Sequence, residues 1–198
     1  TTQARLVRQR DSIPMSPMIA VDALARALPS DAIIVDESIT ASLDVNAMIQ
    51  VSNRGDYYSG RGGGIGQGLA GAIGIQAAHP DRPVIAISGD GSAMYSITAF
   101  WTAAHHGLPI IFVILSNKEY RVLKHNLDIF RDRFDADSNR PYPHLDITGP
   151  DLGFVDMARG MGVGADRIEH PADIADAVTR ALMAGRPYVL DIQVSGKR

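Results

Sequence analysis

The sequence predicts a three-layer α/β domain, in which a doubly wound, mostly parallel sheet of about six strands lies between two layers of helices. Two apolar runs rich in β-branched residues, residues 84–88 and 110–115, are typical of strands buried on both faces of a parallel sheet. About twenty residues of helical pattern join these runs, which is the arrangement of a βαβ unit. Both runs end in polar residues, and in an open parallel sheet the carboxyl ends of the strands border the crevice where ligands bind.

The composition is that of an ordinary globular domain. The 198 residues suffice for one domain with one core, and 45% of them are apolar and 21% charged. The net charge of −3 gives no reason to expect binding to nucleic acid or to a membrane, and no apolar run approaches membrane-spanning length. The absence of cysteine excludes disulfides and thiol catalysis. The polar start is not a signal peptide and Thr1 is not a methionine, so we expect a cytoplasmic protein and a fragment or processed product.

The first sixteen residues differ in character from the rest. Residues 1–16 are basic and polar without a sustained period, and we interpret them as a linker remnant before a domain over residues 17–198. Ser16 as N-cap and Pro17 at the first helical position predict the start of a helix. A short buried strand is expected next, over residues 32–35.

Polar residues follow this strand and should face the same crevice as the other strand ends. For Asp36 and Glu37 two further interpretations stay open, namely a solvated loop or the cap of a helix expected over residues 42–49.

A glycine-rich segment, residues 57–68, opens the next expected helix, which runs through residues 69–77. Residues 66–71 fit the pattern GxGxxG and Asp90 lies 19 residues beyond, so a nicotinamide dinucleotide site is a competing interpretation. Two features oppose it. Glycines and polar residues precede the pattern where a buried strand is required, and Asp90 is flanked by glycines instead of ending a strand alone.

The strongest chemical signal is Gly89-Asp90-Gly91-Ser92 at one strand end, with Asn117 at the next strand end, 27 positions after Asp90. A carboxylate, an amide oxygen and nearby carbonyls form an all-oxygen ligand set, which suits Mg²⁺ or Ca²⁺ and not Zn²⁺. The glycines permit a sharp turn, and Ser92 with the next helix N-terminus offers donors to an anion. Cation and anion together indicate a diphosphate held through its metal.

This constellation resembles the GDG…N motif of thiamine diphosphate-dependent enzymes, in their C-terminal, diphosphate-binding domain, and the similarity extends over most of the chain. The resemblance implies the thiamine diphosphate-binding fold, with thiamine diphosphate and Mg²⁺ as cofactors. It implies that Asp90, Asn117 and the main-chain carbonyl of Glu119 hold the metal. For the cofactor it implies that the hydroxyls of Ser38 and Thr40 lie at the diphosphate, and that the carbonyl of Gly63 and the apolar wedge Ile65 lie at the middle of the cofactor. It also implies that four further residues bind the cofactor, namely Gly89, Gly91, Ser92 and Tyr120. Plain core packing is the alternative for Ile65.

The second half of the chain offers no further site. After Ser92 we expect one helix ending at Gly107, with Trp101 and the methionines in the core. His105 and His106 do not share a helix face, so we expect a helix end and not a metal site. The remaining segments are expected to be a long polar loop over residues 128–150, either a lid or a mobile surface loop, a helix over 151–161, a strand over 163–168, a helix over 171–183 and a strand over 188–194.

The family members most similar are benzoylformate decarboxylase and acetolactate synthase-like enzymes. Tyr120 is aromatic as in several thiamine-dependent decarboxylases, and Leu123 is aliphatic as in benzoylformate decarboxylase-like enzymes. Lys124, His125 and Asn126 replace the aromatic residues that an aromatic substrate would require. The implied reaction is addition of the thiazolium C2 carbanion to the keto carbon of a small 2-oxo acid, followed by loss of CO₂. An acetolactate synthase-like carboligase is the alternative.

No segment resembles the family's pyrimidine-binding domain, which carries the glutamate that activates the cofactor. We therefore assign no catalytic residue to this chain and expect that domain, in the same enzyme or a partner subunit, to supply it. An interpretation of another class is a cofactor-binding module without activity of its own. Because its cofactor-binding face would be uncovered, we also expect self-association into a homo-oligomer.

Overall fold

One six-stranded sheet organises the fold. The computed structural model describes residues 2–60, 62–136 and 142–196. In this part of the chain the strands lie in the order β2-β1-β3-β4-β6-β5 and every neighbouring pair is parallel, which confirms the predicted α/β class. The strands are β1 (Ile33–Glu37), β2 (Tyr57–Ser59), β3 (Val84–Gly89), β4 (Ile111–Ser116), β5 (Gly164–Ile168) and β6 (Tyr188–Gln193).

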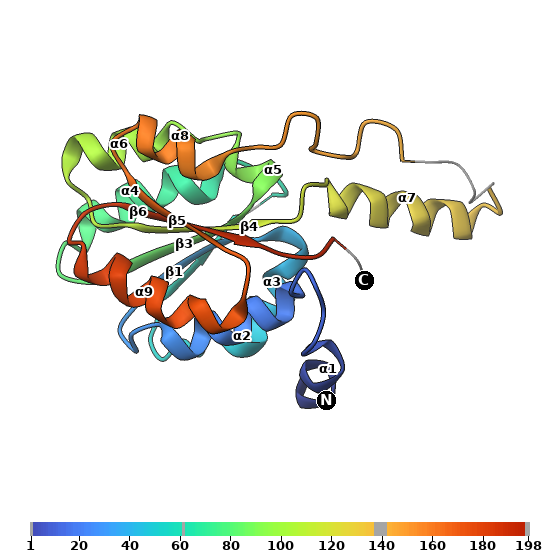
Figure 1. Ribbon diagram of the computed structural model, residues 1–198, viewed down its shortest axis with the longest axis horizontal. Helices are drawn as coiled ribbons and strands as arrows, with labels where there is room; N and C mark the ends of the chain where they lie inside the picture. The colour runs from blue at the N-terminus through green and yellow to red at the C-terminus, as the bar shows by residue number, and fades with distance from the viewer. Residues whose placement is uncertain (1, 61, 137–141, 197–198) are drawn as a thin grey trace.

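Helices cover both faces of the sheet, as Figure 1 shows. On one face lie α2 (Pro17–Ala27), α3 (Ser42–Met48) and α9 (Ile174–Met183), and on the other lie α4 (Gln67–Ala78), α6 (Ala99–His106) and α8 (Phe154–Gly160). Each face has its own apolar core. Leu24, Val45 and Val178 belong to the first, and Leu69, Phe100 and Phe154 to the second, all nearly or fully buried.

The strand order changes direction at β1, since β2 lies on one side of it and β3 on the other. The register pairs Glu37 with Ser88 and Gly89 with Leu115, so the carboxyl ends of β1, β3 and β4 lie level with one another. Open α/β sheets bind ligands beyond the strand ends at such a reversal. The fold therefore directs attention to the segments that follow β1, β3 and β4.

Strand β1 continues two residues further than the apolar pattern indicates. Asp36 and Glu37 belong to the strand and are each 3% exposed. The interpretation of these residues as a solvated loop or as the cap of α3 is therefore wrong. The edge strand β2 was not expected, because its three residues are partly exposed and lack an apolar run.

Residues 2–9 form the helix α1 (Thr2–Gln9), where the sequence suggested a linker remnant with at most one frayed turn. None of its residues is buried, and Arg5 lies 3.3 Å from Asp44 of α3 in an ion pair. Because the helix has no buried side, the composition gave no sign of it.

The single helix expected after Ser92 is divided into the one-turn helix α5 (Asp90–Ala93) and α6, with turns between them. Trp101 is 55% exposed and Met94 is 38% exposed, so the assignment of these two residues to the core was wrong. Gly107 ends α6 with φ of 63°, as predicted.

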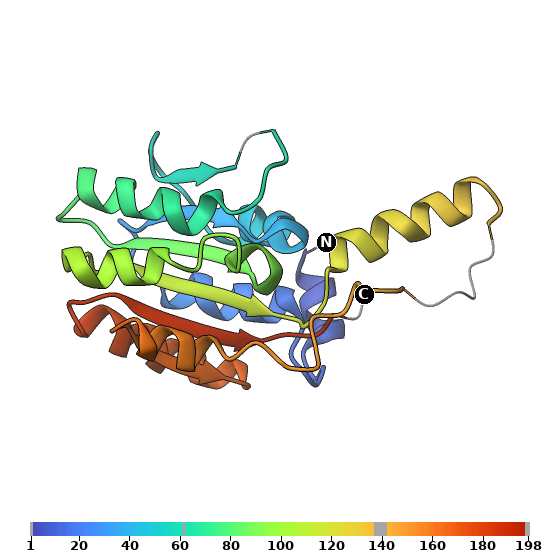
Figure 2. The same ribbon diagram turned by 90° about the horizontal axis from the view of Figure 1, so that it is seen from above.

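Helix α7 (Arg121–Arg133) projects from the body of the domain in both ribbon views (Figures 1 and 2). Residues 128–133 belong to it, so the expected polar loop over 128–150 begins too early. Arg131 is its one buried residue, and Ile129 and Phe130 are about half exposed. The polar character of the segment, rich in Arg, Lys and Asp, concealed its helical period. Residues 137–141 of the expected loop lie outside the described residues.

The remaining elements follow the predicted order. Helix α8 begins at Phe154, three residues later than expected, and the expected helix over 171–183 consists of the 3₁₀ turn η2 (Pro171–Asp173) and α9. A second 3₁₀ turn, η1 (Ile39–Ala41), follows β1. Among the described helices none has the length and apolar character needed to cross a membrane.

Candidate functional site

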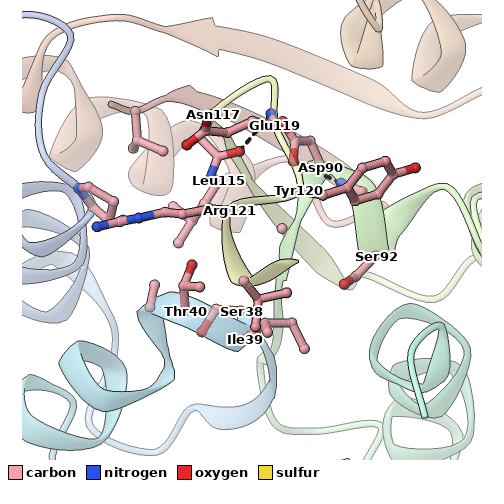
Figure 3. Close-up of a pocket in the computed structure, with 16 residues that line it drawn as sticks. Ser38, Ile39, Thr40, Asp90, Ser92, Leu115, Asn117, Glu119, Tyr120 and Arg121 are labelled. Carbon is pink, nitrogen blue, oxygen red and sulfur yellow. Dashed lines mark hydrogen bonds between the residues drawn. The ribbon is translucent and has the colours of Figure 1, made fainter. Parts of the chain in front are cut away.

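A cleft opens beyond the carboxyl ends of β1, β3 and β4 (Figure 3). Segments that are far apart in the sequence meet here, with Asp90, Asn117 and Glu119 on one side and Ser38 and Thr40 on the facing side. The structure thus brings together nine of the residues singled out in the sequence, namely Ser38, Thr40, Gly89, Asp90, Gly91, Ser92, Asn117, Glu119 and Tyr120.

Asp90 is a buried carboxylate, 4% exposed, at the end of β3. Its Oδ1 accepts the N–H of Gly91 at 2.8 Å and its Oδ2 accepts the N–H of Lys118 at 2.6 Å. Burial raises the pKa of Asp90, these N–H groups oppose the rise, and the carboxylate of Asp191 adds to it. No lysine, arginine or histidine side chain of the described residues forms an ion pair with Asp90.

A buried carboxylate without a protein cation calls for another source of positive charge. Asp90, Asn117 and Glu119 line the same cleft, and their carboxylate, amide and main-chain carbonyl groups offer oxygen atoms. This set contains oxygen donors only, which fits a hard divalent cation such as Mg²⁺. The described residues contain no group of three His, Cys, Asp or Glu side chains that could hold a metal.

The turn after β4 has a strained backbone. Lys118 has φ of 61°, which is uncommon for a residue other than glycine. This conformation directs its N–H to Asp90, while the Oδ1 of Asn117 accepts the N–H of Glu119 at 3.0 Å. The turn therefore connects the strand ends of β3 and β4 through hydrogen bonds. Strained residues often gather at functional sites, and Ile39, with φ of 53°, lines the facing wall.

The segment after β1 is held by Asp36. Its Oδ1 accepts the N–H and the hydroxyl of Ser38, at 2.8 and 2.5 Å, and its Oδ2 accepts the hydroxyl of Tyr57 at 2.6 Å. Burial and the hydrogen bond to Asp36 raise the pKa of Tyr57 above its usual range. The Asp36 carboxylate thus fixes the direction in which the chain enters the turn that carries Ser38 and Thr40.

A larger cleft of about 870 Å³ adjoins the first and shares Gly91, Ser92 and Tyr120 with it. Gly63 and Ile65 of the glycine-rich segment line it, as does Leu123. Ile65 is 40% exposed, which is against the alternative of plain core packing. His144 and Leu145 also line this cleft, and the sequence gave no local signal for them.

At the boundary between the two clefts the Tyr120 ring approaches the backbone so closely that only glycine fits at position 91. A Cβ atom at this position would lie 2.7 Å from a ring carbon of Tyr120, well inside normal contact distance. Gly91 and Tyr120 therefore pack directly on each other, and the motif glycine sets the position of the aromatic ring.

Glu37 caps a helix, but a different one from the helix over residues 42–49 that the sequence suggested. Its Oε1 and Oε2 accept the N–H groups of Gln67 and Gly68, each at 3.0 Å, so it caps the N-terminus of α4. In a dinucleotide-binding fold those N–H groups would face a pyrophosphate. Because a protein carboxylate already occupies them, the structure disfavours the competing GxGxxG interpretation.

His105 and His106 lie in the last turn of α6 and line neither cleft, as expected for a helix end. Trp101 stacks on His105, with 4.8 Å between ring centroids. Lys124, His125 and Asn126 also line neither cleft.

The chain matches a protein family described as thiamine pyrophosphate enzyme, C-terminal TPP binding domain, over residues 40–192. It is 36% identical over 179 residues to the benzoylformate decarboxylase of Pseudomonas aeruginosa, covering 90% of this chain and 32% of that protein. It is also 36% identical over 184 residues to a Mycobacterium tuberculosis protein assigned as acetolactate synthase large subunit IlvX, covering 91% of this chain and 35% of that protein.

Among solved structures, the thiamine diphosphate-dependent 4-hydroxybenzoylformate decarboxylase of Rhodococcus jostii RHA1 has a TM-score of 0.84 at 34% identity. The similarity covers 93% of this chain and 33% of that one. The chain thus spans about a third of the length of the relatives it matches.

Proposed function

Because the chain belongs to the family of C-terminal, thiamine pyrophosphate-binding domains of thiamine pyrophosphate enzymes, we propose that it holds thiamine diphosphate through Mg²⁺ as part of a 2-oxo acid decarboxylase. The observation that carries the proposal is Asp90, a buried carboxylate that has no cationic partner among the described residues and shares its cleft with Asn117. When bound, the cofactor supplies a nucleophilic carbon and an electron sink for the loss of CO₂.

In this proposal the smaller cleft holds the metal and the diphosphate. Asp90, the Oδ1 of Asn117 and the carbonyl of Glu119 bind Mg²⁺, whose charge balances the buried carboxylate. Ser38, Thr40 and Ser92 are the hydroxyl donors around the diphosphate, with Gly89 and Gly91 keeping the backbone close to it. Tyr120 lines both clefts and marks the passage between the two halves of the cofactor.

The larger cleft holds the rest of the cofactor and the substrate. Gly63 presents its carbonyl to the pyrimidine, and Ile65 is the apolar wedge that keeps the cofactor bent. The cleft is lined by both apolar and hydroxyl-bearing side chains, with Tyr57, Tyr95 and Leu123 among them. A 2-oxo acid with an apolar substituent fits such a lining.

Two observations favour decarboxylation. Both the Pseudomonas aeruginosa relative and the Rhodococcus jostii structure are named as decarboxylases, of benzoylformate and of 4-hydroxybenzoylformate. Carboligation is the second candidate, because the Mycobacterium tuberculosis relative of equal identity is assigned as an acetolactate synthase subunit. The two reactions differ in whether a proton or a second carbonyl compound reacts after CO₂ has left.

The acid that activates the cofactor comes from outside these residues. The two carboxylates of the larger cleft, Asp36 and Glu37, are both held by hydrogen bonds that support the fold. The chain spans about a third of its relatives, which leaves room in the whole protein for a pyrimidine-binding domain, in the same chain or a partner subunit. Residues 1–198 alone would bind the cofactor weakly and self-associate through the uncovered clefts.

Calorimetric titration with thiamine diphosphate, with and without Mg²⁺, tests the binding half of the proposal. Release of CO₂ from aliphatic and aromatic 2-oxo acids tests the catalytic half. We expect Mg²⁺-dependent binding and no detectable turnover by the 198 residues alone, since general acid–base catalysis contributes about 10²–10⁴-fold and here also forms the nucleophile. Robust turnover would require an acid within this chain, and binding without Mg²⁺ would remove the metal from the proposal.

A further inference from the structure

A lysine lies between two carboxylates beside the metal-binding turn. The ammonium group of Lys124 in α7 donates to Glu119 Oε2, and it lies 2.6 Å from Oδ1 of Asp146. The side chains of Lys124 and Glu119 are only 17% and 16% exposed, so this pair is shielded from water.

Backbone contacts join the same two segments. Glu119 and Asp146 form an antiparallel β-bridge. On either side of it the N–H of Tyr120 donates to the carbonyl of Leu145 at 2.8 Å, and the N–H of Ile147 donates to the carbonyl of Lys118 at 2.7 Å. Residues 118–120, which directly follow Asn117, are therefore paired with residues 145–147.

We propose that Lys124 is a positioning residue for the metal site. By joining the side chains of Glu119 and Asp146 it keeps residues 118–120 paired with residues 145–147, and so fixes the main-chain carbonyl of Glu119 and the Asn117 amide in the arrangement that binds Mg²⁺. The inference rests on the proposed function, because it concerns the same metal.

The physical reason is that the β-bridge carries an acid on each side. Without Lys124 the carboxylates of Glu119 and Asp146 lie close together with no positive charge between them, and like charges that face each other across strands are destabilising. The side chain of Glu119 lies close to Gly196, since a Cβ atom at that position would lie 2.2 Å from its Oε1. Asp146 is 63% exposed and can turn toward water, but the side-chain link between the two backbone segments is then lost all the same, so their pairing loosens and Glu119 becomes free to move.

If Lys124 acted through its charge alone, its loss would change the affinity for the metal in the opposite direction. Loss of a positive charge near a cation site, with no movement of the ligands, strengthens cation binding. Loss of the clamp, by which we mean the link that Lys124 makes between Glu119 and Asp146, weakens cation binding instead. Asp146→Asn removes a negative charge, so a charge-only role predicts weaker metal binding in this variant and stronger binding in Lys124→Met, whereas loss of the side-chain link predicts weaker binding in both.

The experiment measures the Mg²⁺ concentration that gives half-maximal binding of thiamine diphosphate to the full 198-residue chain, at fixed cofactor. In Lys124→Met we expect this midpoint to rise about 10–100-fold, the range seen when groups that orient metal ligands are lost. Asp146→Asn should also raise the Mg²⁺ midpoint, and in Lys124→Arg the midpoint should lie much closer to that of the wild type than in Lys124→Met. The matched control is Asp151→Asn, which removes the exposed ion pair of Lys118 on the same turn and should leave the midpoint unchanged.

A second measurement needs no cofactor. Hydrogen exchange of the Tyr120 and Ile147 amides should become faster in Lys124→Met and stay unchanged in Asp151→Asn. Wild-type binding with an unchanged or lower midpoint in Lys124→Met would overturn the inference and leave the proposed function standing. Absence of Mg²⁺-dependent binding in the wild type would overturn the proposed function, and unchanged amide exchange in Lys124→Met would separately show that the clamp does not hold this turn.

Discussion

Replacing Glu37 by glutamine should destabilise the domain by about 2–4 kcal/mol. The carboxylate is 3% exposed and accepts two backbone N–H groups of α4, each at 3.0 Å. Hydrogen bonds to a charged group contribute about 1.5–3 kcal/mol each, and a buried donor left without a partner costs about 1–3 kcal/mol. The amide oxygen of glutamine can keep one bond, but its NH₂ then faces the other N–H group. The favourable charge at the helix N-terminus is lost as well.

Urea unfolding followed by circular dichroism measures the effect. For a chain of this size the expected loss corresponds to a fall in Tm of about 5–15 °C. Glu169→Gln is the matched control, because Glu169 is 60% exposed in its pair with Arg167 and should change stability by less than about 0.5 kcal/mol. A Glu37→Gln variant as stable as the wild type would refute the capping role. Glu37 would then become the first candidate for an acid within the chain.

Two further variants test the site and its surroundings. Ile65→Ala should lower the free energy of unfolding by less than about 1.5 kcal/mol, because Ile65 is 40% exposed. The circular dichroism band of the bound cofactor should weaken more than the affinity for the cofactor does. A loss of about 3 kcal/mol or more in the free energy of unfolding would make Ile65 a core residue. Asp191→Asn tests the pH dependence of the free energy of unfolding. Burial raises the pKa of Asp191, so this carboxyl group makes its full contribution to wild-type stability below pH 3.8 and loses it as pH rises through the raised pKa. The variant should therefore be the more stable of the two in urea at pH 7 but not at pH 3.5, and lower stability at pH 7 would contradict the sign.

The sequence was most informative where a local pattern determines the structure. The apolar runs before Gly89 and Asn117 identify β3 and β4, because strands buried on both faces leave no polar alternation. The motif from Gly89 to Ser92 then follows a strand end, and the parallel topology alone brings it near Asn117. Most of the candidate site could be assembled in this way.

The features that were missed depend on distant contacts or on the absence of a core-facing side. Glu37 meets its partners Gln67 and Gly68 about thirty positions later in the sequence, and no local pattern reports such a bond. Helix α7 is polar overall and begins directly after the metal-binding turn, so its helical period was not recognised and its second half was assigned to a polar loop. Lys124 was noted only for not being aromatic, because its two acidic partners come together through the pairing of residues 118–120 with 145–147.

The most direct test of the metal-linked cofactor site is the affinity of Asp90→Asn for thiamine diphosphate, measured by calorimetry with and without Mg²⁺. Asparagine keeps the shape of the side chain and one oxygen but removes the only charge in the proposed ligand set. The wild type should bind in a Mg²⁺-dependent manner, and the variant should lose at least about 100-fold in affinity, or about 2.7 kcal/mol, while circular dichroism shows an intact fold. Unchanged affinity in the folded variant would contradict the assignment of Asp90 as the metal-binding carboxylate.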